Sequence, residues 1–322
     1  MEFFAGLLKN LSFPLFLLTS QDSQFYAPTY IGAALTAIVL YLIVKRRSKL
    51  SVKGALQIIL PRRIVRHAST LLDLKLFFFG AYYILLQVLL VGGLTYFTVP
   101  GTVAALSAMF GSPPAAHGPS YLITAITMAL VFMAAEFGYW ISHFMMHKIP
   151  ALWEFHKVHH SAEVLTPLTE WRQHPLELAL FPLLMGGASC FVQGPMVWYF
   201  GEAAQVVNPM TANYISMAFW FTILHLRHSE LPVYATGLLG HIVQAPAHHQ
   251  VHHSTNPKHF DKNLGYCLSV FDWLFGTLYV PRKGEIFSFG LGHKDTALET
   301  AIGSMITPID RAFRLLVAPL RK

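Results

Sequence analysis

Three short stretches of the sequence concentrate histidine at helical spacing. They read HFMMH from His143, HKVHH from His156 and HHQVHH from His248. Residues three and four positions apart share one face of a helix, so each stretch brings two or three imidazoles together. Of the 17 His in the chain, 14 lie between His143 and His259. Neutral imidazole is a ligand for Zn, Cu, Fe and Ni, and the clustering therefore predicts a metal centre.

The number of imidazoles indicates two metal ions. The three faces present His143, His147, His156, His159, His160, His249, His252 and His253. A single four-coordinate zinc would leave about half of this set unused, whereas two metals use it all. Neither Cys190, inside an apolar run, nor Cys267 supplies a thiolate site or a disulfide framework. Further candidates lie at the edges of apolar runs or beside a cluster: His174, His225, His228 and His248.

The composition places these histidines in a membrane protein. Hydrophobic residues make up 54% of the chain, charged residues make up 12%, and the mean hydropathy is +0.47, which is too apolar for an ordinary soluble domain. A spanning helix needs about 20 apolar residues. Such runs occur near 28–44, 76–99, 121–142, 176–200 and 203–224. We expect an all-α membrane bundle with about four to five spanning helices, although the sequence leaves open whether the fourth and fifth runs cross fully.

The basic residues predict which side of the membrane carries the histidines. With KRRSK at 45–49 in the cytoplasm, every Lys and Arg except Lys9 falls on the cytoplasmic side, and the 100–120 loop without Lys or Arg lies outside. This topology puts the N-terminus outside and makes the His-rich cap cytoplasmic. It predicts a multi-pass protein of the bacterial inner membrane, or of the endoplasmic reticulum in a eukaryote. The formal charge of +7 forms no patch with interleaved aromatic residues, so nucleic acid is not expected as a partner.

We expect three parts along the chain. Residues 1–75 form a membrane span and a basic interfacial segment, residues 76–282 form the catalytic domain, and residues 283–322 form an amphipathic tail. The segment GALQIILPRRIVRH at 54–67 suits the lipid headgroup layer but equally fits an ordinary juxtamembrane helix. The N-terminus has no basic region typical of a cleaved signal peptide.

The histidine stretches resemble a known family. HFMMH, LWEFHKVHHS and APAHHQVHHS resemble, in order, the three histidine boxes of the fatty acid hydroxylase / sterol desaturase superfamily. EWRQHPLE at 170–177, LRHS at 226–229, HFDKNLG at 259–265 and FDWLFGTLYVP at 271–281 resemble its flanking signatures. The resemblance covers roughly 125–282 and includes neither the first apolar run nor the tail.

The resemblance implies a membrane enzyme in which two non-haem iron ions activate O2 to hydroxylate or desaturate a lipid C–H bond. Carried over by position, it implies as ligands His143, His147, His156, His159, His160, His228, His249, His252 and His253. His225 could substitute for His228. Two departures from the family pattern are Phe144, where Arg is common, and Glu230, where Asn or His is frequent.

Several carboxylates are candidates for orienting the imidazoles, because a metal-binding His donates its other ring N–H to an acceptor. They are Glu136, Glu163, Glu170, Glu230 and Asp261. The alternative for each is a solvated charge or a helix cap. No residue was expected to bind an organic cofactor, since the chain has no G-x-G-x-x-G after a strand and no haem-attachment motif.

Electrons must therefore come from a partner. A ferredoxin, a cytochrome b5-like protein or a reductase is implied, and the basic cytoplasmic surface suits an acidic carrier. The other expected partner is the membrane lipid substrate. The sequence does not decide between hydroxylation and desaturation, nor does it name the lipid, the carbon or the oligomeric state.

A different hypothesis is a His-rich membrane metal transporter or metal-binding membrane protein. Transport would place polar ligands within the spans, but the clusters lie at the ends of the apolar runs. An intramembrane metalloprotease would need H-E-x-x-H, which the chain lacks.

Overall fold

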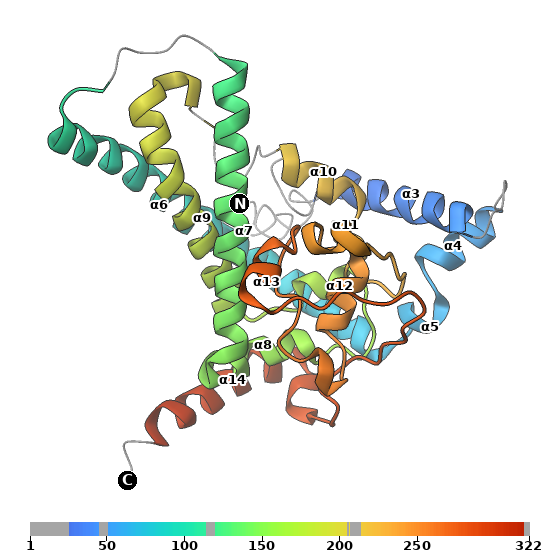
Figure 1. Ribbon diagram of the computed structural model, residues 1–322. Coiled ribbons are helices and arrows are strands. Elements are labelled where there is room, and N and C mark those ends of the chain that lie inside the picture. Colours follow the sequence, from blue (N-terminus) through green and yellow to red (C-terminus); the bar gives the residue numbers. More distant parts are fainter. Residues whose placement is uncertain (1–25, 45–50, 114–119, 205, 207–213, 319–322) are drawn as a thin grey trace, which may run out of the picture.

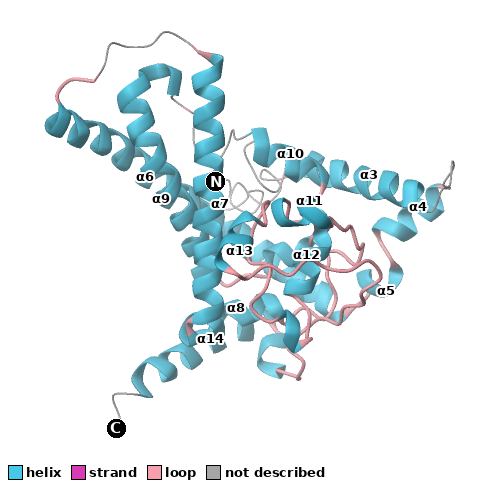
Figure 2. Cartoon of the chain, viewed as in Figure 1, coloured by secondary structure: helices cyan, strands magenta, loops and turns pink. Residues whose placement is uncertain are grey.

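The computed structural model describes residues 26–44, 51–113, 120–204, 206 and 214–318 (Figure 1). Within these ranges the regular structure is helical, and no β-strand is formed there (Figure 2). Only two isolated β-bridges occur among these residues, Val243 with Leu268 and Ser254 with Phe289. The predicted all-α class is confirmed.

Three long helices carry most of the apolar sequence: α6 (Ala68–Phe110), α7 (Tyr121–Lys148) and α9 (Pro175–Phe200). The segments Gly92–Phe110, Tyr121–Lys148 and Pro175–Ala204 are long and apolar enough to cross a bilayer. Helix α9 packs along both α6 and α7. The fourth apolar run therefore forms one helix of spanning length.

Close packing of α7 on α9 depends on a residue without a side chain. A Cβ added at Gly138 would lie 2.5 Å from the carbonyl oxygen of Leu184, so the two backbones approach more closely than any larger residue permits. Small residues serve the same purpose in other membrane helix pairs. This contact aligns the histidine-bearing end of α7 with the start of α9.

The first and fifth apolar runs form a separate pair of shorter helices. Helix α3 (Ala27–Val44) packs against α10 (Tyr214–Thr222) and η3 (Leu224–Leu226), and it runs across the direction of α7 in Figure 1. With nine residues, α10 is too short to span a bilayer. Three helices of spanning length and the shorter apolar α3 agree broadly with the predicted number of spans. The predicted external N-terminus lies outside the described residues.

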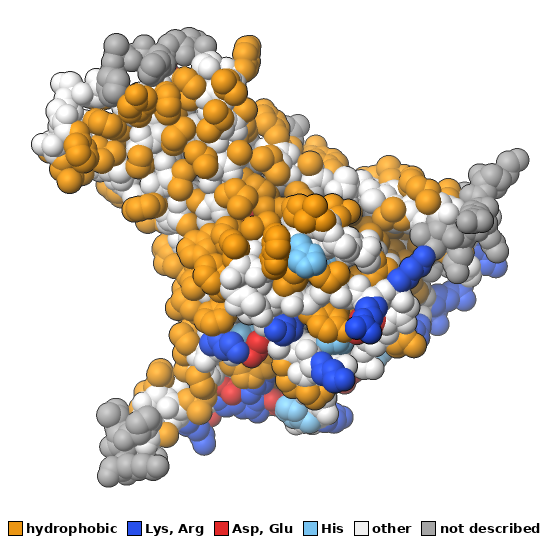
Figure 3. All heavy atoms as spheres, in the orientation of Figure 1, with side chains coloured by type: hydrophobic (Ala, Val, Ile, Leu, Met, Phe, Trp, Pro, Cys, Tyr) orange, Lys and Arg blue, Asp and Glu red, His pale blue; other side chains and the backbone are white. Residues whose placement is uncertain are grey.

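Charged side chains gather away from the long apolar helices. Figure 3 shows hydrophobic side chains over the region of α6, α7 and α9, and Lys, Arg, Asp and Glu toward the opposite end. That end is built from shorter helices: α4 (Val52–Ile59), α5 (Arg62–Val65), α8 (Pro150–His160), α11 (Gly237–Ile242), α12 (Pro246–His252), α13 (Val270–Phe275) and α14 (Ala301–Val317). Such segregation is typical of a membrane protein with a polar cap.

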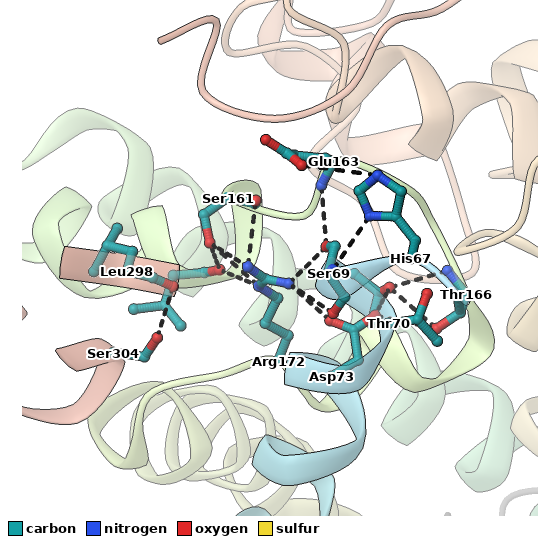
Figure 4. A network of polar contacts seen from close by, with 12 residues as sticks. His67, Ser69, Thr70, Asp73, Ser161, Glu163, Thr166, Arg172, Leu298 and Ser304 are labelled. Atoms are coloured by element: carbon teal, nitrogen blue, oxygen red, sulfur yellow. Dashed lines mark hydrogen bonds and ion pairs between the residues drawn. The ribbon is translucent and has the colours of Figure 1, made fainter. Parts of the chain in front are cut away.

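A buried ion pair ties the polar cap to α6. Arg172 donates from Nη1 to Asp73 Oδ1 at 3.0 Å and from Nε to the carbonyl oxygen of Val158 at 3.0 Å, and both charged side chains are almost fully buried. The other Asp73 oxygen accepts from Thr169 Oγ1 at 2.7 Å and Thr166 Oγ1 at 3.1 Å. Figure 4 shows this network between α6 and the segment that follows α8. It fixes the position of the His-rich α8.

We predict that Asp73→Ala lowers the free energy of unfolding by about 3–5 kcal/mol, because it leaves the Arg172 charge buried without its partner. Thermal unfolding in detergent, followed by intrinsic fluorescence, measures the loss. Asp310→Ala is the control, since its pair with Arg314 is exposed and contributes little. Equal melting temperatures for the two variants would contradict a central role for the ion pair.

Candidate metal centre

Each histidine stretch lies on a helix whose boundary is well defined. Helix α7 ends at Lys148, and α8 begins at once with Pro150 at its first turn, where proline is favoured because its missing N–H costs no helix bond. Helix α12 likewise starts with Pro246. These chain reversals turn the histidine faces of α7, α8 and α12 toward one another.

Five imidazoles form what we term the first cluster: His143, His147, His156, His160 and His252. One nitrogen of each ring lies within 4.8 Å of the corresponding nitrogen of every other ring in the cluster. His156 Nε2 is 3.0 Å from His143 Nε2 and 3.2 Å from His160 Nε2. These nitrogens converge on one point from three helices.

Four imidazoles form the second cluster: His159, His228, His249 and His253. His228 Nε2 is 2.8 Å from His249 Nε2 and 3.2 Å from the Nε2 atoms of His159 and His253. His228 follows η3, so this cluster joins a residue from the α10 segment to α8 and α12. The sequence could not assign rings to clusters, and the structure divides neighbours such as His159 and His160 between them.

The donor set fits two metal ions. Ligand nitrogens about 2.0–2.1 Å from a tetrahedral metal lie roughly 3.3 Å from one another, close to the separations within each cluster. His147 Nε2 and His252 Nε2 are buried without a hydrogen-bonding partner among the described residues, which is costly for a ring nitrogen unless a metal binds it. Burial lowers the pKa of His160 and His253 well below the usual value, and adjacent imidazoles lower it further. These two rings are therefore neutral, as metal ligands must be.

In the first cluster, the second nitrogen of several rings lies beside a hydrogen-bond acceptor. His156 Nδ1 lies 2.6 Å from Glu177 Oε1, and His147 Nδ1 lies 3.3 Å from Asp261 Oδ1. Backbone carbonyls serve two further rings, Leu264 for His143 at 2.8 Å and Lys262 for His252 at 2.9 Å. Such acceptors fix the tautomer that leaves Nε2 free for a metal.

Glu170 braces the second cluster. Its Oε2 lies 2.9 Å from His228 Nδ1, and both its oxygens accept hydrogen bonds from Arg227. Burial alone would raise the pKa of the Glu170 carboxyl, but the charge of Arg227 and the contact with His228 hold that pKa well below its usual range. Glu170 is therefore a permanent anion beside the ring of His228.

Three of the proposed orienting carboxylates contact other groups instead. Glu136 accepts from the backbone N–H groups of Cys267 and Leu268 at 2.9 and 2.8 Å. Glu163 faces His67 at 3.9 Å on an exposed loop, and Glu230 pairs with Arg63. The structure therefore places each of these carboxylates against a partner away from the clustered rings.

Three of the additional histidine candidates also lie outside both clusters. His225 Nε2 is 2.8 Å from Thr29 Oγ1, and its ring stacks on Tyr30. His174 caps α9, with Nε2 3.0 Å from the carbonyl oxygen of Met305. His248 Nε2 is 3.0 Å from the carbonyl oxygen of Gly240. Each ring has a structural partner that occupies the nitrogen expected to bind metal.

Two residues at the site were not among the candidates from the sequence. Glu177 is the last residue of the stretch EWRQHPLE. Its position three residues after His174 indicates the start of a helix but not a contact with a ligand ring. Arg227 stands directly before His228 in LRHS, but no pattern of charge in the sequence indicated that it is buried beside Glu170. Both depend on contacts between distant segments.

Comparison with known proteins finds relatives across this region. Residues 128–277, which include all the clustered histidines, match the model of the fatty acid hydroxylase family. The chain is 30% identical over 173 residues to an alkylglycerol monooxygenase of Xenopus tropicalis, covering 54% of this chain and 34% of that protein. The human alkylglycerol monooxygenase is 27% identical over 168 residues, covering 52% and 34%.

A bacterial relative is also similar. The ornithine lipid hydroxylase of Rhizobium tropici is 26% identical over 173 residues, covering 53% of this chain and 47% of that protein. The matched region thus spans about a third to about half of the length of these curated relatives. No solved structure gives a significant match.

We predict that His160→Ala and His253→Ala each lose one metal ion and retain the other, because the two rings belong to different clusters. Metal content per chain, measured by mass spectrometry of the purified protein, tests this. His293→Ala is the control, since its ring is exposed beyond both clusters. Two ions in both cluster variants, or the loss of both ions in each, would rule out two separate sites.

We also predict that Glu177→Ala weakens metal binding at the first cluster by about 10–100-fold, the usual effect of removing an acceptor behind a ligand imidazole. Competition with a chelator of known affinity measures the change. Glu163→Ala should bind metal as the wild type does. If Glu177→Ala matches Glu163→Ala, the contact with His156 has no influence on the ligand.

Proposed function

We propose that this protein is a membrane di-iron enzyme that hydroxylates a lipid C–H bond with O2, because residues 128–277 match the model of the fatty acid hydroxylase family. The observation that carries the proposal is the convergence of nine imidazoles, eight of them buried, in two adjacent clusters at the polar end of the long apolar helices. Within the family-matched region, no other group of His, Cys, Asp or Glu among the described residues has this geometry.

The two clusters would hold one iron ion each. Iron there would supply an oxidant derived from O2, which an unactivated methylene requires and no side chain provides. The chain's own residues orient the ligand rings: Glu177 and Asp261 at the first cluster, and Glu170 at the second. One oxygen atom enters the C–H bond, and the other leaves as water after an external donor supplies two electrons and solvent two protons.

Apolar side chains pack against the rings of the first cluster. Phe181 of α9 packs against His143, His156 and Tyr139, with ring centroids 5.6, 6.3 and 4.9 Å apart. Tyr139, Phe181 and Met146 form one buried cluster with Met185 at its edge. We propose that the lipid chain approaches the rings along this apolar cluster, from which water is excluded.

The relatives narrow the proposed substrate. Their names specify alkylglycerols and an ornithine lipid, which are lipids with polar groups joined to long chains. We propose a substrate of this general kind, and hydroxylation rather than desaturation. The division at 75 and 282, the cytoplasmic side of the clusters, and location in a bacterial inner membrane, or in the endoplasmic reticulum of a eukaryote, are parts of the same proposal.

The electron donor is proposed to be an external ferredoxin, cytochrome b5-like protein or reductase. Lys148 lies beside Asp261 and His147 at the first cluster, at 2.5 Å from Asp261 Oδ2, and its side chain is partly exposed. A cationic surface this close to a ligand suits an acidic carrier. Metal transport has less support, because the clustered rings lie together at one end of the long helices and do not follow a path through them.

The test is oxygen incorporation by the purified, iron-loaded protein in lipid vesicles. With a reducing system and ¹⁸O2, we expect a lipid product heavier by one ¹⁸O atom, and none with His160→Ala. His293→Ala should retain the activity. A product lacking two hydrogens would identify a desaturase, and an unchanged lipid pool with vesicle-trapped metal would favour transport.

A further inference from the structure

Arg227 is a buried cation with one unused face. Its side chain is 2% exposed, and Nε donates to Glu170 Oε2 at 2.8 Å while Nη2 donates to Glu170 Oε1. The remaining nitrogen, Nη1, is buried and has no hydrogen-bonding partner among the described residues. A guanidinium presents its donors in a rigid fork, so the pairing with Glu170 aims Nη1 toward the opposite edge.

The guanidinium lies against two aromatic rings, one of which also contacts the first cluster. The Arg227 Cζ atom is 4.6 Å from the ring centroid of Tyr266 and 5.8 Å from that of Tyr139. The Tyr139 ring in turn lies 5.5 Å from the His143 ring and 4.9 Å from Phe181. The guanidinium is therefore held beside the apolar approach described for the lipid, one residue from His228.

Among the described residues, no acceptor has hydrogen-bonding geometry to Nη1. Glu136 is the nearby carboxylate of α7, but its Oε2 accepts from Cys267 and Leu268, and Glu170 is engaged along the other edge of the fork. A buried donor of a charged group left unpaired is costly. Since native proteins satisfy such donors, the position is suited to an acceptor that arrives with a ligand.

We propose that Arg227 Nη1 donates a hydrogen bond to an oxygen atom of the lipid substrate, an ether or carbonyl oxygen close to the carbon that is oxidised. This inference rests on the proposed function and narrows its substrate to lipids with such an oxygen within the apolar approach. Glu170 and the two tyrosine rings keep the donor fixed, so the bound oxygen sets which part of the chain faces the rings. A hydrocarbon chain without this oxygen would have no fixed position relative to the rings.

A purely structural role for Arg227 makes a different prediction. If Arg227 only held Glu170 against His228, its replacement would change metal binding, or it would change the affinity for every lipid by the same factor. A hydrogen bond to the lipid instead makes the effect depend on whether the lipid carries the oxygen. The two roles are separated by changing Arg227 and the lipid oxygen, singly and together, and comparing the affinities. This design follows a double-mutant cycle.

The experiment measures binding of matched lipids to the metal-loaded protein in detergent, by competition with a radiolabelled lipid. The probes are 1-O-hexadecylglycerol and icosane-1,2-diol, in which a methylene replaces the ether oxygen, and 1-hexadecanoylglycerol distinguishes a carbonyl from an ether acceptor. We expect the wild type to favour one or both oxygen-containing chains by about 10–150-fold, the range for a hydrogen bond to a charged group.

Arg227→Lys keeps the charge beside Glu170 but loses the fork, so it should retain both metals and bind all three probes alike. Arg63→Lys, in the exposed pair with Glu230, should keep the wild-type preference. Equal binding of the probes by the wild type, undetectable binding of both oxygen-containing probes, or an unchanged preference in Arg227→Lys would overturn the proposal. The wild-type comparison decides even if the variant is unstable. Because binding needs no turnover, failure of the ¹⁸O2 experiment would be seen separately.

Discussion

Nine imidazoles can share a small volume only if they remain neutral, and neutrality depends on their burial. Protonated rings at separations near 3 Å would repel one another strongly in a medium of low dielectric constant. Burial and mutual repulsion both lower the pKa of rings such as His160 and His249. His147 Nε2 and His252 Nε2 are also buried without a hydrogen-bonding partner among the described residues, so the arrangement suits a metal ion.

Fixed anions and carbonyls behind the rings complete this arrangement. Each neutral imidazole has one N–H, and an acceptor on Nδ1 determines that Nε2 faces the cluster. Glu177 performs this role at the first cluster and Glu170 at the second. The buried Asp73–Arg172 pair then positions the segment that carries Glu170 relative to α6. The polar cap is thus held by charges that would be unstable if any partner were removed.

The site also depends on the boundary between apolar and polar parts of the fold. Helices α7 and α9 approach closely at Gly138, and their aromatic side chains reach the rings from the apolar side. The short helices of the polar cap bring the remaining ligands from the other side. A lipid substrate and an external electron donor could therefore approach from opposite directions.

The sequence by itself determined the helical class, the apolar runs, and the stretches that supply the nine clustered rings, because helix periodicity and hydropathy are local properties. It could not divide His159 from His160, since neighbours on one helix point to different clusters only when α7, η3 and α12 pack around them. It also could not tell that Glu177 and Glu170 reach ligand rings while Glu136 and Glu163 do not. Those choices, and the unused donor of Arg227, depend on distances between segments far apart in the chain, which only tertiary packing sets.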